Sequence, residues 1–267
     1  MANKGKYYES QFEEATVELL REAHWQHTFG DDIHRKYTDP LIEEDLRNFL
    51  SVQYIDKDLT TTELDSIVAN LRNAGGQNDY YALRNTFLLY RDGYDFAYND
   101  GRNNPFRLEY IDFEHPDHNI FRCVNQFVME QGRENRRPDI LLFVNGIPVC
   151  IIELKNPTKQ NATIRDAHTQ ICTRYMRDIP ALLKYCALAV ISDGAKNALG
   201  TTYTPFEFFY EWKKIENEDK AGKGLDTLRT LIRGALSPER ILEILRDYVY
   251  FPDPTKEEDT TEIVCRY

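Results

Sequence analysis

Two apolar segments joined by an Asn-Gly pair at 145–146 constrain the fold more than any other feature. The segments are ILLFV (140–144) and IPVCIIEL (147–154), and Asn-Gly between such runs is a strong signal of a β-hairpin. The second segment is apolar at nearly every position up to Glu153, as expected of a central strand covered on both faces. A further apolar run, YCALAVIS (185–192), predicts another buried strand.

Helical patterns lie on both sides of these strands. Apolar spacing predicts helices at 9–24, 40–54, 62–74, 78–90, 163–178, 205–216, 225–236 and 237–251, and strands at 106–113 and 120–129. The expected fold class is therefore α/β, with a mixed central sheet flanked by helices and additional N- and C-terminal helices. We expect four parts: 1–94 helical and contributing the first core helix, 95–200 the core, 201–250 a helical extension, and 251–267 an acidic tail.

Composition excludes several classes of protein. The 267 residues are 42% hydrophobic and 12% aromatic, which excludes a disordered chain. No run of eighteen apolar residues predicts a membrane span, and the N-terminus has no apolar leader. The five cysteines show no CxxC spacing, so we expect reduced thiols and a cytoplasmic location.

The charge is unevenly distributed along the chain. Net charge is −11, and residues 1–70 carry 7 basic and 15 acidic side chains. Residues 133–177 instead carry 8 basic and 4 acidic side chains, an excess of four positive charges. Such a local excess is sufficient to contact a phosphate backbone, and the alternative is a solvated helix face.

Asp139, Glu153 and Lys155 form the pattern with the clearest chemistry. Glu153 and Lys155 are two residues apart on a predicted strand, so their side chains share a face. Burying both charges in an apolar strand is costly without partners. Two carboxylates with a lysine suit phosphodiester hydrolysis, because carboxylates hold Mg²⁺ and lysine orients water and neutralises developing charge. The alternative is a surface carboxylate beside a structural Glu–Lys pair.

The register of the hairpin decides whether Asp139 joins the other two. A plain two-residue turn pairs Asp139 with Ile152 and places it on the face opposite Glu153. A three-residue loop with Gly146 in the left-handed region and a bulge pairs Asp139 with Ile151, on the same face as Glu153. We predict that bulged register, or an equivalent distortion at Pro138.

The segments around these residues resemble a known family. The string VNQF…RPDILLFVNGIPVCIIELKNPTKQNA…QICTRYMRDIPALLKYCALAVISDG is similar to the N-terminal nuclease region of type I restriction enzyme R subunits, in the PD-(D/E)xK superfamily. The match is most specific over 120–195, with support from the first helix and PFEFFYEWKKI (205–215). The resemblance implies a PD-(D/E)xK restriction-endonuclease-like core.

The resemblance also implies roles for single residues. Asp139 and Glu153 match the metal-binding acids, the carbonyl of Leu154 a further ligand, and Lys155 the catalytic lysine. Family members carry a glutamate on the first helix that completes the metal shell; here Glu13 is the best match and Glu9 the second.

A glutamine and a tyrosine four residues apart, implicated in DNA handling, follow the lysine in the family. Gln170 and Tyr175 are five apart here, which leaves them about 140° apart on a regular helix. Either a π-bulge realigns them, or Tyr175 keeps the role without Gln170. The expected phosphate contacts are Arg133, Arg136, Arg137, Lys159 and Arg165.

The resemblance implies a Mg²⁺-dependent endonuclease, with Mn²⁺ as a substitute, acting on double-stranded DNA together with methyltransferase and specificity subunits. No GxxxxGK[ST] loop occurs, so ATP binding is expected only in motor domains absent from this chain, which resembles an N-terminal fragment. The alternatives are a stand-alone repair or resolvase-type nuclease and a non-catalytic docking module. His115 and His118 flank a turn and are expected only to solvate it.

Overall fold

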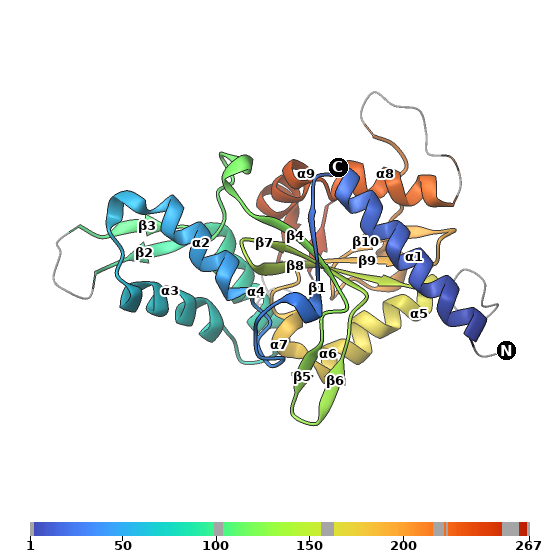
Figure 1. Cartoon of the computed structure of the whole chain (residues 1–267), viewed down its shortest axis with the longest axis horizontal. Coiled ribbons are helices and arrows are strands. Elements are labelled where there is room, and N and C mark those ends of the chain that lie inside the picture. The colour runs from blue at the N-terminus through green and yellow to red at the C-terminus, as the bar shows by residue number, and fades with distance from the viewer. Residues whose placement is uncertain are drawn as a thin grey trace.

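A six-stranded mixed sheet forms the centre of the fold (Figure 1). The computed structural model describes residues 3–98, 104–155, 163–215, 222, 224–252 and 262–265, with side chains described from residue 10. In sheet order the strands are β1 (Gln26–Phe29), β4 (Phe121–Asn125), β7 (Ile140–Val144), β8 (Ile147–Leu154), β9 (Leu188–Ser192) and β10 (Asn197–Gly200). The β1–β4 and β8–β9 pairs are parallel, and the other pairs are antiparallel.

Helices cover both faces of this sheet. One face packs under a helical segment that runs without a break through α5 (Ile164–Thr169), a π-helix (Gln170–Tyr175) and α6 (Met176–Asp178), followed by α7 (Pro180–Leu183). The other packs under α1 (Asn3–Glu22), α8 (Leu225–Ala235), α9 (Pro238–Glu243) and a second π-helix (Ile244–Tyr248). The remaining helices are α2 (Glu43–Gln53), α3 (Thr61–Asn73) and α4 (Asp79–Asp92), which lie with β2 (Tyr94–Phe96) and β3 (Phe106–Leu108) at one end of the molecule (Figure 1).

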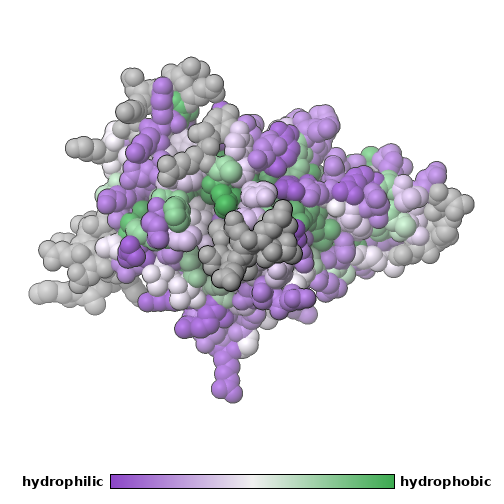
Figure 2. Space-filling model, turned by 180° about the vertical axis from the view of Figure 1, so that it is seen from behind, coloured by the Kyte–Doolittle hydropathy of each residue, from purple (hydrophilic) through white to green (hydrophobic). Residues whose placement is uncertain are grey.

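Two short hairpins complete the described strands. They are β5 (Met129–Gln131) with β6 (Glu134–Arg136), and β11 (Val249–Tyr250) with β12 (Ile263–Val264). The predicted mixed sheet flanked by helices is confirmed. The face seen in Figure 2 is mainly hydrophilic, with a small hydrophobic area near its centre. No described helix is long and apolar enough to cross a membrane.

The register of the β7–β8 hairpin differs from the one predicted, which paired Asp139 with Ile151, although Asp139 still shares a face with Glu153. Val144 pairs with Ile147, so the turn has two residues, and Asn145 and Gly146 both have positive φ, of 50° and 76°. The extra residue lies within β8 instead, between the Phe143–Pro148 and Leu142–Cys150 pairs. The three-residue loop is therefore wrong, but this bulge brings Ile140 opposite Ile152 and places Asp139 beside Glu153.

Tertiary contacts hold the two-residue turn. The Asn145 side chain is fully buried; it accepts a hydrogen bond from the Ile120 amide at 2.7 Å and donates to the Tyr110 carbonyl at 3.0 Å. The Gly146 carbonyl accepts from the Ile42 amide at 2.9 Å, so the α2 N-terminus touches the turn. A longer loop would displace these partners, whereas a bulge inside β8 leaves them in place.

Other differences concern short segments. The helix predicted at 205–216 is wrong: only Phe206–Phe208 forms a 3₁₀ turn, and Tyr210 then pairs with Leu199 of β10. The strand predicted at 120–129 ends at Asn125, because Gln126 has a φ of 56°. The strand predicted at 106–113 is paired only over Phe106–Leu108.

We expect Gly146→Ala to destabilise the chain by at least about 2 kcal/mol, because φ is positive and a Cβ would lie 2.1 Å from the Ile42 carbonyl oxygen. Gly132→Ala is the matched control, with a φ of 62° and nothing within 4 Å of a Cβ. Urea unfolding gives the loss of unfolding free energy in each variant: Gly132→Ala reports the cost of the positive φ alone, and Gly146→Ala that cost together with the steric clash. Equal losses would show that contact with α2 does not constrain the turn.

Candidate active site

The open end of the β7–β8 hairpin brings together Asp139, Glu153 and Lys155. They lie on the sheet face covered by the continuous helix of α5, the π-helix and α6, here called the α5 segment. Asp139 lies two residues before Leu141 and Glu153 two residues after Ile151, and both of these apolar residues pack in the core cluster beneath that segment. The amide of Leu154 donates to the Asp139 carboxylate at 2.7 Å. Glu153 is 1% exposed and the Lys155 side chain 14%, so the two acids and the lysine lie at a partly open end of a buried strand.

Four side chains form a closed ring of hydrogen bonds on this face. The Lys155 ammonium donates to Glu153 Oε1 and to Gln170 Oε1, both at 2.7 Å. The Gln170 amide nitrogen donates to the Tyr175 hydroxyl at 2.7 Å, and that hydroxyl donates to Glu153 Oε2 at 3.2 Å. Each polar group therefore fixes the next, and Lys155 is held between the strand and the helix.

The ring depends on a π-helix. Residues Gln170–Tyr175 form a π-helix in the middle of the helical segment that was predicted at 163–178. A π-helix closes its hydrogen bonds over five residues, so residues five apart stack on one side. The π-bulge alternative is confirmed, and Gln170 takes part in the ring instead of being lost from it.

Burial and charge make Glu153 an unusual carboxyl group. Desolvation raises the pKa of Glu153 to about 8; the Asp139 charge adds to the rise, and Lys155 and Tyr175 oppose it. Burial also raises the pKa of Tyr175, which keeps its hydroxyl a hydrogen-bond donor. A proton on Glu153, or a cation beside the two carboxylates, is therefore favoured.

Glu13 lies on the α1 face of the sheet, opposite the face of Asp139 and Glu153, and contacts Asn125, a residue that sequence reasoning missed. The Asn125 amide donates to Glu13 Oε1 at 2.7 Å, so its own oxygen accepts from His27 Nε2 at 2.9 Å. Asn125 is buried at the end of β4, on the face that α1 covers, and a polar residue ending an apolar strand was the available signal. Glu13, Asp139 and Glu153 do not bring one oxygen each within 4.8 Å of one another. The Glu9 side chain lies outside the described residues.

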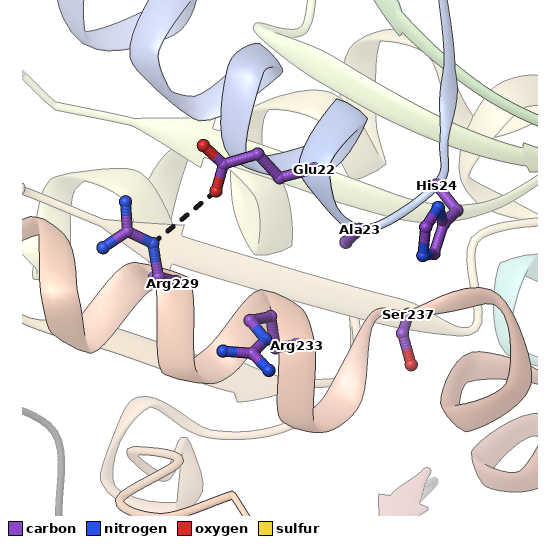
Figure 3. A pocket seen from close by; sticks show the side chains of 6 residues that line it. All are labelled: Glu22, Ala23, His24, Arg229, Arg233 and Ser237. Atoms are coloured by element: carbon purple, nitrogen blue, oxygen red, sulfur yellow. Dashed lines mark ion pairs between the residues drawn. The ribbon is translucent and has the colours of Figure 1, made fainter.

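The position of α1 is fixed at its other end. Trp25 Nε1 donates to the Leu236 carbonyl at 2.7 Å, just beyond α8. A cavity of about 430 Å³ lies between the two helices, and an ion pair at 3.7 Å joins Glu22 and Arg229 in its lining (Figure 3). These contacts dock α1 on α8 and so limit where Glu13 can lie.

The predicted phosphate contacts differ in their surroundings. Arg136 is paired with the buried Asp178, at 2.7 Å, and with Glu134. Arg133 and Arg137 are exposed, and the exposed Arg165 places its guanidinium 4.3 Å from the centre of the Phe206 ring. Lys159 lies outside the described residues.

The fold and this site define an α/β protein with a carboxylate–lysine cluster on a central hairpin. Residues 6–208 match the family described as the type I restriction enzyme R protein N terminus, and the chain belongs to that family.

Curated relatives carry related names. The chain is 30% identical over 256 residues to the type I restriction enzyme HindI endonuclease subunit of Haemophilus influenzae, covering 91% of this chain and 24% of that protein. It is 32% identical over 209 residues to the putative type I restriction enzyme MjaIXP endonuclease subunit of Methanocaldococcus jannaschii, covering 71% and 19%. The chain thus spans a quarter or less of the length of these relatives.

The raised pKa of Glu153 predicts a stability that falls with pH in metal-free protein. Because the folded-state pKa of about 8 exceeds the usual value of 4.5, the folded state binds the proton more tightly, and stability is lost as pH rises from 4.5 through 8. Glu153→Gln removes this ionisation. The free energy of unfolding of the variant, relative to that of the parent, should therefore rise by at least about 1 kcal/mol between pH 5 and pH 8. Urea unfolding in EDTA at several pH values measures how the free energy of unfolding of each protein depends on pH. The same dependence in parent and variant would contradict the prediction.

The π-helix predicts tolerance of a deletion. Removing the exposed Thr173 leaves Gln170 and Tyr175 four residues apart on a regular helix, so the ring should re-form with a stability change within about 1 kcal/mol. Removing the exposed Ser66 from regular α3 rotates the buried Ile67 out of the core and should cost several times more. Chemical unfolding compares the two deletions, and an equal loss would argue against a one-residue insertion.

Proposed function

We propose that this chain is the nuclease region of a type I restriction enzyme R subunit, with a PD-(D/E)xK core that cleaves double-stranded DNA. The observation that carries the proposal is the convergence of Asp139, Glu153 and Lys155 on one face of the hairpin. Membership of the R protein N-terminus family and relatives named as endonuclease subunits support it.

The residues present fit a hard divalent cation. Two carboxylates and a nearby main-chain carbonyl are oxygen ligands, which Mg²⁺ and its substitute Mn²⁺ prefer. Glu153 is destabilised as an anion by burial and by Asp139, and a cation would relieve both effects. Asp139, Glu153 and the Leu154 carbonyl would hold the ion; Glu13, the candidate to complete the set, would have to leave Asn125 to reach it. When bound, the ion would polarise the phosphate and make its bound water more acidic.

The other members of the ring prepare the site. Lys155 orients the attacking water and neutralises charge on the phosphate, because its ammonium is held at the edge of the buried strand. Gln170 and Tyr175 position Lys155 and Glu153 through the ring. Arg133, Arg137 and Arg165 are exposed and would contact DNA phosphates without reading sequence.

The proposal places the chain in a larger enzyme. Methyltransferase and specificity subunits would be its partners in the cytoplasm, and target choice would reside in the specificity subunit. ATP-driven translocation would belong to motor domains elsewhere in the R subunit.

Two measurements with matched controls test the proposal. Asp139→Asn should weaken Mn²⁺ binding at least about tenfold by calorimetry, whereas Asp65→Asn, an exposed carboxylate on α3, should leave it unchanged. In the assembled enzyme, Lys155→Ala should lower DNA cleavage at least about a hundredfold and spare ATP hydrolysis, with the exposed Lys213→Ala as control.

Each alternative has its own outcome. Unchanged Mn²⁺ binding in Asp139→Asn, with normal cleavage by Lys155→Ala, would refute a nuclease site and favour a docking module. Efficient cleavage by this chain without partners or ATP would favour a stand-alone nuclease.

A further inference from the structure

A second cluster of potential metal ligands lies in the connection between β3 and β4. Asp112, His115 and His118 are the one group of three Asp, Glu, His or Cys residues, within the described ranges, whose ligand atoms all lie within 4.8 Å of one another. The two imidazoles come from either end of a 3₁₀ turn, Pro116–His118, whose first residue is proline. A sequence reading assigns them only to solvation of this turn.

The Asp112 carboxylate is rigidly anchored. Its side chain is 6% exposed; one oxygen accepts from the amides of Glu114 and His115 at 3.0 and 2.9 Å, and the other from the Gln53 side chain at 3.0 Å. Asn119 binds both the amide and the carbonyl of Asp112. Asp112 is therefore fixed both by α2, through Gln53, and by hydrogen bonds within its own loop.

Both histidines turn the same ring nitrogen towards that oxygen. Nδ1 of His118 lies 2.9 Å and Nδ1 of His115 lies 3.4 Å from Asp112 Oδ2. The rings are stacked, with centroids 4.8 Å apart and an interplanar angle of 21°. In a tetrahedral zinc site with bonds of about 2.0–2.2 Å, neighbouring ligand atoms are about 3.3–3.6 Å apart, so the His115–Asp112 distance already fits and the His118–Asp112 distance would have to lengthen.

The geometry points to a zinc site formed by Asp112, His115 and His118. Two imidazole nitrogens and one carboxylate oxygen suit Zn²⁺ better than Mg²⁺, which prefers oxygen alone. Gln53 donates to the same carboxylate oxygen, Asp112 Oδ2, as an outer-shell partner does. Three protein ligands leave a fourth position for water or an anionic group.

The surroundings favour a cation and give it access. Asp112 and His115 line a cavity of about 720 Å³ that also contains Asp92, Glu109 and Glu114. The two arginines that line it, Arg91 and Arg246, are each paired with a neighbouring aspartate, at 2.6 and 2.9 Å. The imidazoles are 59% and 50% exposed, so an ion can reach them without rearrangement of the core.

The test uses the tag-free chain with Zn²⁺ in calorimetry and Co²⁺ in absorption spectroscopy. We expect one zinc equivalent, and a tetrahedral cobalt spectrum in the visible range. His115→Ala with His118→Ala should weaken zinc binding at least about tenfold. His34→Ala removes another exposed histidine and should leave the affinity unchanged.

Independence from the nuclease site provides the second comparison. Asp139→Asn should keep the zinc affinity of the parent, and the double histidine variant should keep its Mn²⁺ affinity. Both imidazoles are exposed, so circular dichroism should show an unchanged fold in the histidine variants. Zinc binding that is absent from the parent, or equal in the parent and the double variant, would overturn the site and leave the histidines as hydrogen-bond partners of Asp112.

Discussion

The burial of Glu153 in the central strand is the constraint on which the rest of the site depends. An anion there loses its hydration, so every polar atom around it must supply a compensating contact. Lys155 and Tyr175 do so directly, and Gln170 does so by joining the two. The ring therefore forms only when the helical segment packs against β8 at the distance and the rotation about its axis that bring Gln170 and Tyr175 to Lys155 and Glu153. The same burial that makes Glu153 costly also keeps competing water away from the two carboxylates, which strengthens their attraction for a cation.

Two one-residue insertions bring the ring partners into register. Side chains alternate along a strand, so one extra residue in β8 moves Glu153 and Lys155 to the face that Asp139 occupies. The insertion lies in the middle of the hairpin, and Val149 and Cys150 accordingly pack in the same core cluster. In the helical segment, the π-helix likewise brings Gln170 and Tyr175 to the same side, as the bulge brings Glu153 to the face of Asp139. Both distortions serve the same few atoms, as is common for irregular elements beside functional sites.

The sequence predicted the elements whose own residues determine them. The strand at 147–154 matches β8, and the helix at 62–74 matches α3 (Thr61–Asn73), whose Thr60 and Glu63 form a capping box. The position of the bulge could not be predicted from the local sequence pattern, because it depends on residues distant in the chain that contact Asn145 and Gly146. Likewise the aromatic run at 206–212 has helical spacing, yet Tyr210 pairs with β10. The candidate acids and the lysine could be chosen from spacing alone, whereas Asn125 required the packing of α1 on the sheet.

The two candidate metal sites differ in the chemistry of their ligands, and this difference would keep their ions apart. Asp139, Glu153 and a main-chain carbonyl offer oxygen alone, which Mg²⁺ prefers. Asp112, His115 and His118 offer two nitrogens and one oxygen within 4.8 Å of one another, a ligand set that favours zinc. Zinc held at the second site leaves the first open to the far more abundant magnesium. The anchoring of Asp112 by Gln53, at the C-terminal end of α2, would also tie that helix to the loop before β4. Since the N-terminus of α2 touches the Gly146 turn, that helix contacts both the β7–β8 hairpin and the loop before β4.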